Sequence, residues 1–403
     1  MRISNLRNRI ISFFLYRLHR YKAKIESQIF KLNIPHIKEY KGINKLTLSH
    51  FSAFNYSNVG DTLLPINVKD SINLLDESRI NWKDFHVHKL VDEKIINQIN
   101  QTNGVIIGGG GLFLKDTHRN KLSGWQWNCS IENLEKISVP IALFAVGYNR
   151  FRGQEEFDAI FFKHLELLSD KSFFIGMRNK GSIENLKKYI PERNHHKIKL
   201  QFCPTTISSK LYPDIIYPNK SEESKVIAVN MAFDRSHFRF GEQIGEKLTA
   251  VANILKKLYE SGYEIHYYSH MQTDENFLIY LESFEIPYKL IRLRDPKDTL
   301  IKYSIPKLVI GMRGHAQMIP FGCETPILSI ISHEKMRWFL QDIGMEEWGV
   351  EMSSSNFEQE LAKIMNSILI NFDQIQKQIS ETQSHILEST NQNVKFILNN
   401  FKN

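Results

Sequence analysis

The sequence predicts an α/β protein built from two Rossmann-like domains that face each other across a cleft, with helical extensions at both ends. Short β-branched and aromatic runs alternate with amphipathic helical patterns, as expected for βαβ units around a parallel sheet. The alternation occurs in two blocks separated by a stretch without a clear period. The chain of 403 residues is also longer than a single core supports, which favours two domains.

The first block, residues 41–207, predicts the N-terminal domain. Between its strands, residues 91–99 and 155–168 have the spacing of amphipathic helices. Six runs rich in β-branched and aromatic residues predict strands at Leu46–Phe51, Phe85–Leu90, Gly104–Ile107, Ile141–Gly147, Phe173–Met177 and Ile198–Phe202.

A linker is predicted over residues 208–224, which contain Pro213 and Pro218, a charged stretch at residues 220–224 and no clear period. The second block, residues 225–355, predicts the C-terminal domain, and residues 356–403 have a helical period. Strands are expected at Val226–Met231, Tyr263–Tyr268, Tyr288–Leu293, Lys307–Ile310 and Ile327–Ile330, and helices near Gly241–Tyr259, Glu275–Phe284, Asp298–Ser304 and Glu334–Ile343.

The net charge of +8 is concentrated at the N-terminus. Residues 1–34 hold eight Lys and Arg residues against Glu26 alone, which accounts for +7 of that charge. The rest of the chain is close to neutral, whereas a protein that binds duplex nucleic acid is expected to have a basic body. We therefore expect no nucleic-acid partner.

The basic segment, residues 1–40, also carries apolar side chains with a helical period, including Phe13, Phe14 and Leu18. One interpretation is an interfacial helix that docks on an anionic membrane surface. The other is a helix that packs on the body and leaves its charges in water. Its apolar run, residues 10–16, is too short to span a bilayer, and no cleavage site follows it.

The cysteines indicate a reducing compartment. Cys129, Cys203 and Cys323 are far apart in the sequence and odd in number. None has a CxxC partner, and no His-Glu spacing is typical of zinc ligands, so we expect no metal site. The prediction is a cytoplasmic protein, attached peripherally to the inner face of the membrane if the basic segment is interfacial.

The segment Gly311–Ile330 is the most informative part of the chain, because Arg313 and His315 follow an apolar run that predicts a buried strand. The amide groups at the start of the next helix attract anions. Arg313 adds a planar fork suited to carboxylate or phosphate. His315 is the side chain here that titrates near neutrality. Together they predict an anion site with a proton donor.

Two motifs in the first block lie at the carboxyl ends of predicted strands. Asn58, Gly60 and Asp61 follow the first strand, and Asp61 is either a helix N-cap or a general base. A glycine run follows the third strand, where a close ligand or a domain neighbour would explain the cost of ordering it. This run consists of Gly108, Gly109, Gly110 and Gly111.

Basic residues also follow strands of the second block. Arg235, His237 and Arg239 come after its first strand, and His270 ends the next. Each group can also be explained as solvated loop charges. Because several strand ends present cationic or imidazole groups, a small, multiply charged anion is the favoured ligand.

The motifs together resemble the polysaccharide pyruvyl transferase family over residues 50 to 350. The order and spacing carry the resemblance more than any single motif. The matching residues are Asn58-x-Gly60-Asp61, the run Gly108–Gly111, Arg178 with Ser182, His270 with Asp274, Arg313-x-His315, and Pro326 followed by Lys335. The family often has Asp-Pro where this chain has Cys203-Pro204, so a carboxylate role is absent at that position.

The resemblance implies a GT-B-like enzyme that moves a pyruvyl group from phosphoenolpyruvate onto two hydroxyls of a sugar, giving a cyclic ketal. His315 is the first choice for the proton donor, with His237 and His270 in reserve. The donor would contact Arg313 and either Arg235 or Arg239, and Arg178 and Lys335 would also bind substrate. The acceptor, a glycan or lipid-linked sugar, would rest on Asn58, Asp61 and the glycine run. No cofactor is expected beside the phosphoenolpyruvate donor.

Two other functions remain open at this point. A GT-B glycosyltransferase that uses a nucleotide sugar would share the architecture but would need a base pocket and a diphosphate site. A noncatalytic scaffold whose basic N-terminal helix docks on membranes or acidic partners would show neither donor binding nor turnover.

Overall fold

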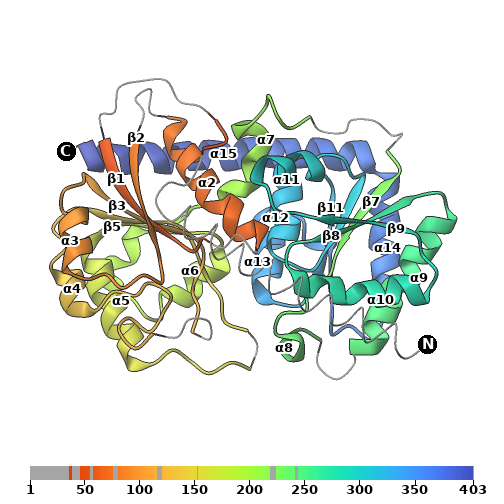
Figure 1. Ribbon diagram of the computed structural model, residues 1–403, viewed down its shortest axis with the longest axis horizontal. Coiled ribbons are helices and arrows are strands. Elements are labelled where there is room, and N and C mark those ends of the chain that lie inside the picture. The colour runs from red at the N-terminus through yellow and green to blue at the C-terminus, as the bar shows by residue number, and fades with distance from the viewer. Residues whose placement is uncertain are drawn as a thin grey trace, which may run out of the picture.

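Two six-stranded parallel sheets, each with its own helices, form the body of the protein (Figure 1). The computed structural model describes residues 36–38, 46–54, 58–75, 80–115, 120–151, 153–217, 224–240 and 244–402. The basic N-terminal segment lies almost entirely outside this described part. The α/β two-domain fold predicted from the alternating pattern is confirmed.

The first sheet has the strand order β2-β1-β3-β4-β5-β6. The order reverses between β1 and β3, and ligands bind open parallel sheets beyond the carboxyl ends of strands at such a point. Its strands are β1 (Leu46–Ser52), β2 (Ile80–His86), β3 (Gly104–Phe113), β4 (Ile141–Tyr148), β5 (Ser172–Met177) and β6 (Ile198–Leu200). The helices between them are α2 (Val59–Asn73), α3 (Glu93–Ile99), α4 (Ile131–Glu135), α5 (Ala159–Lys171), α6 (Lys180–Leu186) and the 3-10 helix η2 (Glu192–Lys197).

The second sheet has the order β12-β11-β10-β7-β8-β9, with its reversal between β7 and β10. Its strands are β7 (Val226–Asn230), β8 (Glu264–Ser269), β9 (Tyr288–Arg292), β10 (Leu308–Gly311), β11 (Ile327–Ile331) and β12 (Gly349–Glu351). The helices are α8 (Ser236–Phe240), α9 (Ile244–Glu260), η5 (Gln272–Phe277), α10 (Leu278–Ser283), α11 (Pro296–Tyr303), α12 (His315–Gly322), α13 (Glu334–Asp342) and η6 (Glu346–Trp348).

Three strands differ from the sequence-based prediction by more than two residues. Strand β2 begins five residues earlier than expected, because its buried Asp84 pairs with Lys69 and breaks the apolar pattern that marks a strand. Strand β3 continues through the glycine run as far as Phe113 instead of ending at Ile107. Strand β12 was not predicted, since three residues are too few to show a period.

The start of the predicted linker is packed structure. Residues Pro204–Ile207 form η3 and Ser208–Leu211 form α7. Tyr212 is buried and donates its hydroxyl to Asp70 Oδ2 at 2.7 Å, which ties the segment to α2. The loop character expected for residues 208–224 therefore does not hold at its beginning.

Helices α14 (Phe357–Ile370) and α15 (Phe372–Lys402) follow the second sheet. Figure 1 shows α15 running along the molecule from the second domain back to the first. Gln383 donates to the Phe321 carbonyl in the second domain, and Asn393 donates to the Leu200 carbonyl in the first at 2.9 Å. This helix therefore contacts both domains.

Candidate active site between the two domains

The carboxyl ends of strands from both sheets meet at the contact between the domains. Strand β10 ends at Gly311 and leads to Arg313 and His315, and β5 ends at Met177 and leads to Arg178. Lys335 of α13 donates to Asn149 Oδ1, just after β4, at 3.1 Å. Titratable side chains from both domains are thus brought into one cluster, as expected from the positions of their strands.

His315 is the first residue of α12 and lies against α2 of the other domain. A Cβ atom on Gly60 would stand 2.0 Å from His315 Nδ1, so glycine is needed for this approach. The Nε2 atom is buried without a hydrogen-bond partner among the described residues. Burial, with Arg178 and Lys335 nearby, lowers the pKa of His315 to about 3. The expectation that it titrates near neutrality is therefore wrong, because these surroundings favour the neutral imidazole.

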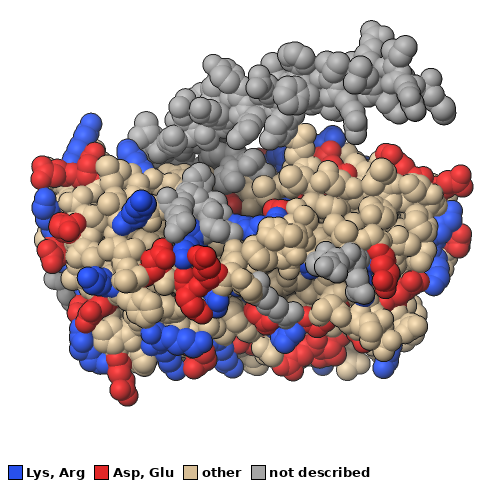
Figure 2. Space-filling view, turned by 90° about the horizontal axis from the view of Figure 1, so that it is seen from below, with Lys and Arg blue, Asp and Glu red and all other residues tan. Residues whose placement is uncertain are grey.

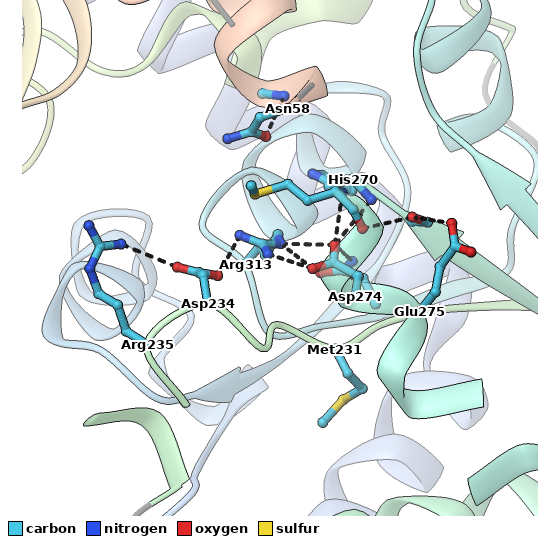
Figure 3. Close-up of polar contacts among 12 residues, drawn as sticks. Asn58, Met231, Asp234, Arg235, His270, Asp274, Glu275 and Arg313 are labelled. Carbon is cyan, nitrogen blue, oxygen red and sulfur yellow. Dashed lines mark hydrogen bonds and ion pairs between the residues drawn. The ribbon is translucent and has the colours of Figure 1, made fainter. Parts of the chain in front are cut away.

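Arg313 is held by two carboxylates of its own domain (Figure 3). Its Nε donates to Asp274 Oδ2 at 2.9 Å, and its Nη1 forms an ion pair with Asp234 Oδ1 at 2.8 Å. Asp274 is itself fixed by the Asn230 side chain at 3.0 Å and by the backbone amide of His270 at 3.1 Å. The sequence predicts that the Arg313 guanidinium binds the substrate. In the structure it is instead bound to carboxylates of the protein.

Asp234 links three arginines. Besides Arg313, it accepts from Arg239 Nη2 at 3.1 Å and from Arg235 Nη1 at 3.3 Å. Burial acts to raise the pKa of Asp234, but Arg239 and Arg313 outweigh it and hold the pKa below its usual range. Arg239 also donates to Ser332 Oγ at 2.8 Å. The carboxylate therefore keeps several cations close together.

Arg178 differs from Arg313 in having donors that the protein does not use. It is 5% exposed, and its Nε and Nη2 have no hydrogen-bond partner in the described part of the chain. A Cβ on Gly147 would lie 2.2 Å from Nε, so this glycine makes room for the guanidinium. A buried arginine with unmatched donors is costly unless an anion completes its hydrogen bonds. Arg178 is thus better placed than Arg313 to bind an anion.

Lys335 is enclosed among the same cations. Burial, together with Arg178 and Arg239, lowers the pKa of Lys335 well below its usual range. His333 caps α13 through Nδ1, which accepts from the Lys335 amide at 3.2 Å, while its Nε2 is buried without a partner among the described groups. A bound anion would restore the charged form of Lys335, because an opposite charge nearby favours ionisation.

Asp61 faces this cluster from the first turn of α2. Asn58 is the N-cap of α2, and its side-chain amide donates to Asp61 Oδ2 at 2.8 Å. Burial raises the pKa of Asp61 to about 6, although Asn58 and Lys335 oppose the shift. Asn58 therefore takes the capping role, and Asp61 has the pKa of a base that works near neutral pH.

The glycine run is packed against the protein itself. A Cβ on Gly108 would stand 1.9 Å from the carbonyl oxygen of Phe144, and one on Gly109 would stand 3.1 Å from Leu64. The φ angle of Gly110 is +113°. Gly111, at the open end, adjoins the Asn149 side chain. Of the two explanations expected, a close ligand or a close neighbour, these contacts supply a neighbour: the run lets strand β3 pack tightly between β4 and α2.

His237 and His270, the two alternative candidates for the proton donor, lie in different surroundings. His270 is fully buried beside Tyr303, to whose hydroxyl its Nε2 is hydrogen bonded, and burial lowers the pKa of His270 well below its usual range. His237 is exposed on α8, where its ring lies 4.0 Å from that of Phe238. Neither adjoins α2 of the other domain as His315 does.

Several residues of the cluster were not singled out from the sequence. Asp234 lies within the segment already noted for its basic residues, so its acidic character next to Arg235 was the available signal. Asn149, Phe151 and His333 show no motif, because only the contact between domains brings them together.

Figure 2 shows Lys and Arg side chains interspersed with Asp and Glu over the face it presents. The described residues visible on that face form no uniformly basic surface of the kind expected for nucleic-acid binding. In the described part of the chain, no helix combines the length and apolar character needed to cross a membrane.

A family model described as polysaccharide pyruvyl transferase matches residues 18–334 of the chain. Among solved structures, the chain is similar to S. aureus MnaA determined with UDP, with a TM-score of 0.52, 13% identity and coverage of 84% of this chain and 91% of that one. Anabaena Alr3699/HepE, determined with UDP and glucose, gives a TM-score of 0.51 at 10% identity, covering 88% and 99%. These likenesses show a GT-B-like fold. The comparison with curated proteins gave no match.

Proposed function

Because the chain belongs to the polysaccharide pyruvyl transferase family, we propose that it transfers the pyruvyl group of phosphoenolpyruvate onto two hydroxyls of a sugar in a surface polysaccharide or its lipid-linked precursor. One observation carries the proposal: Arg178 and His315, from opposite domains, present to the same cluster buried nitrogen atoms that have no hydrogen-bond partner among the described residues. Such a pair suits a small anion that must also receive a proton.

Charge balance supports this donor. Four arginines and, once an anion restores its charged form, Lys335 face three carboxylates, so the cluster then has a surplus of positive charge that a phosphate and a carboxylate would offset. The cations are Arg178, Arg235, Arg239, Arg313 and Lys335, and the carboxylates are Asp61, Asp234 and Asp274.

The proposed reaction begins with proton transfer from His315 to the methylene carbon of phosphoenolpyruvate. The neighbouring carbon becomes oxocarbenium-like, and a sugar hydroxyl attacks it. The C–O bond to phosphate then breaks, and the second hydroxyl closes the ketal. The two hydroxyls lose two protons: one replaces the proton given by His315, and the other leaves with the phosphate. Asp61 is the proposed base for one of these steps.

Positioned acid catalysis of this kind contributes roughly 10²- to 10⁴-fold to a rate. The acid must be protonated when the donor is bound, although burial among cations favours the neutral form of His315. The negative charge of the donor favours the imidazolium, because it offsets the repulsion from Arg178 and Lys335. Binding of phosphoenolpyruvate would therefore favour protonation of His315, the proposed acid. The proposed reaction requires no resident cofactor.

The test is to incubate purified protein with phosphoenolpyruvate and a panel of glycans and to measure released phosphate and pyruvylated product. The expected result is phosphate release that depends on both substrates and is absent from His315→Asn. A parallel incubation with UDP-sugars addresses the alternative. Glycosyl transfer in that incubation, with no phosphoenolpyruvate binding, would replace the proposal by a nucleotide-sugar glycosyltransferase.

The site of action follows from the acceptor. We propose a cytoplasmic enzyme that meets lipid-linked acceptor at the inner face of the membrane through the basic segment. Residues 1–34 lie outside the described part of the chain, so support for this step comes from their composition alone.

A further inference from the structure

The ring of Phe151 lies among cations of the opposite domain. The guanidinium carbons of Arg235 and Arg239 lie 5.2 Å and 5.3 Å from the ring centroid, and Lys335 Nζ lies 5.9 Å from it. The ring of His333 contacts it edge-on at 4.0 Å. One aromatic side chain of the first domain thus meets two guanidinium groups and the Lys335 amine, all supplied by the second domain.

Local hydrogen bonds hold Phe151 in this position. Its amide donates to Gln154 Oε1 at 2.8 Å, and its carbonyl accepts from the Gln154 amide at 3.2 Å. Arg150 Nε donates to the Gln154 carbonyl at 2.8 Å and closes the turn. Two residues earlier, Asn149 accepts from Lys335. The segment that follows β4 therefore offers a fixed ring and a fixed amide to the second domain.

The basic groups around the ring repel one another when charged, and solvent screens them only in part, because Arg239 is buried whereas Arg235 and Lys335 are partly exposed. Phe151 is 3% exposed and Arg239 is 6% exposed. Asp234 contacts Arg235 and Arg239, but Lys335 has no ion-pair partner among the described residues. The negative face of an aromatic ring attracts cations within about 6 Å of its centroid, most strongly where water is excluded.

A ring and a carboxylate would act differently on an incoming anion. A carboxylate beside Lys335 would neutralise it and compete with the anion, whereas a ring carries no net charge. We propose that Phe151 is a positioning residue that holds Arg235, Arg239 and Lys335 together by its π face while leaving their charge available to a phosphate-bearing ligand. This inference rests on the proposed function for the identity of that ligand, phosphoenolpyruvate.

Replacing Phe151 by phenylalanines with one, two and three ring fluorines tests the π face at nearly constant shape. Fluorination progressively removes the negative potential of the ring. The affinity for phosphoenolpyruvate and for inorganic phosphate, measured by titration calorimetry, is expected to fall stepwise, by about tenfold in total. Phe151→Trp should retain binding, and Phe151→Leu should weaken it.

Phe157 provides the matched control. It is also buried, six residues along the chain, but it stacks on Phe161 with a centroid distance of 3.9 Å. The same fluorinated series at position 157 should leave both affinities unchanged.

The outcomes separate the two proposals. If phosphate affinity follows the series but phosphoenolpyruvate does not bind the wild type, Phe151 keeps its role and the donor assignment fails. If phosphoenolpyruvate binds the wild type and its affinity does not change across the fluorinated variants at position 151, the role of Phe151 is refuted and the donor assignment stands. Binding of neither anion by the wild-type protein would overturn both.

Discussion

His315 and Gly60 touch across the domain boundary, with so little space that a Cβ atom on residue 60 would stand 2.0 Å from Nδ1 of the imidazole. The contact joins the start of α12 to the start of α2. It places the proposed proton donor beside Asn58 and Asp61, on the side proposed for the acceptor. Proton transfer and acceptor binding therefore depend on the same contact.

Gly60→Ala is expected to displace His315 and to lower phosphate release by about 100-fold, which is the lower part of the range for a positioned acid. Phosphate release under saturating donor is the measurement. Gly245→Ala is the control, because a Cβ there meets nothing within 4 Å. Equal activity of the two variants would show that the close contact is not needed for catalysis.

The protonation of His315 can be followed during donor binding. At pH 8, where the donor phosphate is already a dianion, binding is expected to take up protons from the buffer, because the bound charge raises the pKa of His315 from its value of about 3. Calorimetry in buffers of different ionisation enthalpy measures this uptake. His315→Asn should bind the donor with less uptake, and unchanged uptake would assign the proton to another group such as Lys335.

Arg178 and Arg313 are expected to respond differently to replacement by lysine. Arg178→Lys should weaken donor binding by about tenfold or more with little loss of stability, since Nε and Nη2 of Arg178 have no protein partner among the described residues. Arg313→Lys should reduce the free energy of unfolding by about 2 kcal/mol, because lysine cannot hold both Asp234 and Asp274. Calorimetric binding and denaturant unfolding measure the two effects. If Arg313→Lys instead lost donor binding and Arg178→Lys lost stability, Arg313 would be the residue that binds the donor.

The raised pKa of Asp61 has a consequence for stability. A carboxyl whose pKa is about 6 in the folded protein, against an ordinary value of 3.8, binds protons more tightly when folded, so stability falls as pH rises between these values. Asp61→Asn should therefore raise Tm at pH 7, with the difference shrinking as pH is lowered to 4. Thermal unfolding across this range is the measurement. A variant less stable than wild type at pH 7 would contradict the expected penalty.

Deletion of residues 1–34 tests the basic segment. If the segment is an interfacial helix, each Lys or Arg near an anionic surface contributes about 1 kcal/mol. The truncated protein should then lose binding to anionic vesicles and turn over lipid-linked acceptor slowly, with activity on a soluble sugar retained. Unaltered vesicle binding would refute this role. Insolubility or unfolding would instead show that the apolar face belongs to the core.

The fold was predictable because apolar runs and helical periods are local properties of the sequence. The position of β2 was not, since Asp84 is buried only because Lys69 pairs with it. In the candidate site, strand ends indicated Arg313 and His315. The partner that occupies Arg313 is Asp274, 39 residues away. Sequence alone also could not predict that the pKa of His315 is low, because burial between domains causes it.

Helix α15 imposes an order on the completion of the first domain. Its Phe401 packs on Gly104 of strand β3, where a Cβ would stand 2.1 Å from the ring. On the ribosome, all six strands of the first sheet emerge long before this side chain is made. An apolar surface of the first domain therefore stays exposed until the second domain has been synthesised and α15 packs on the first domain. Packing of α15 on the first domain is therefore the late step that completes the assembly of the two domains.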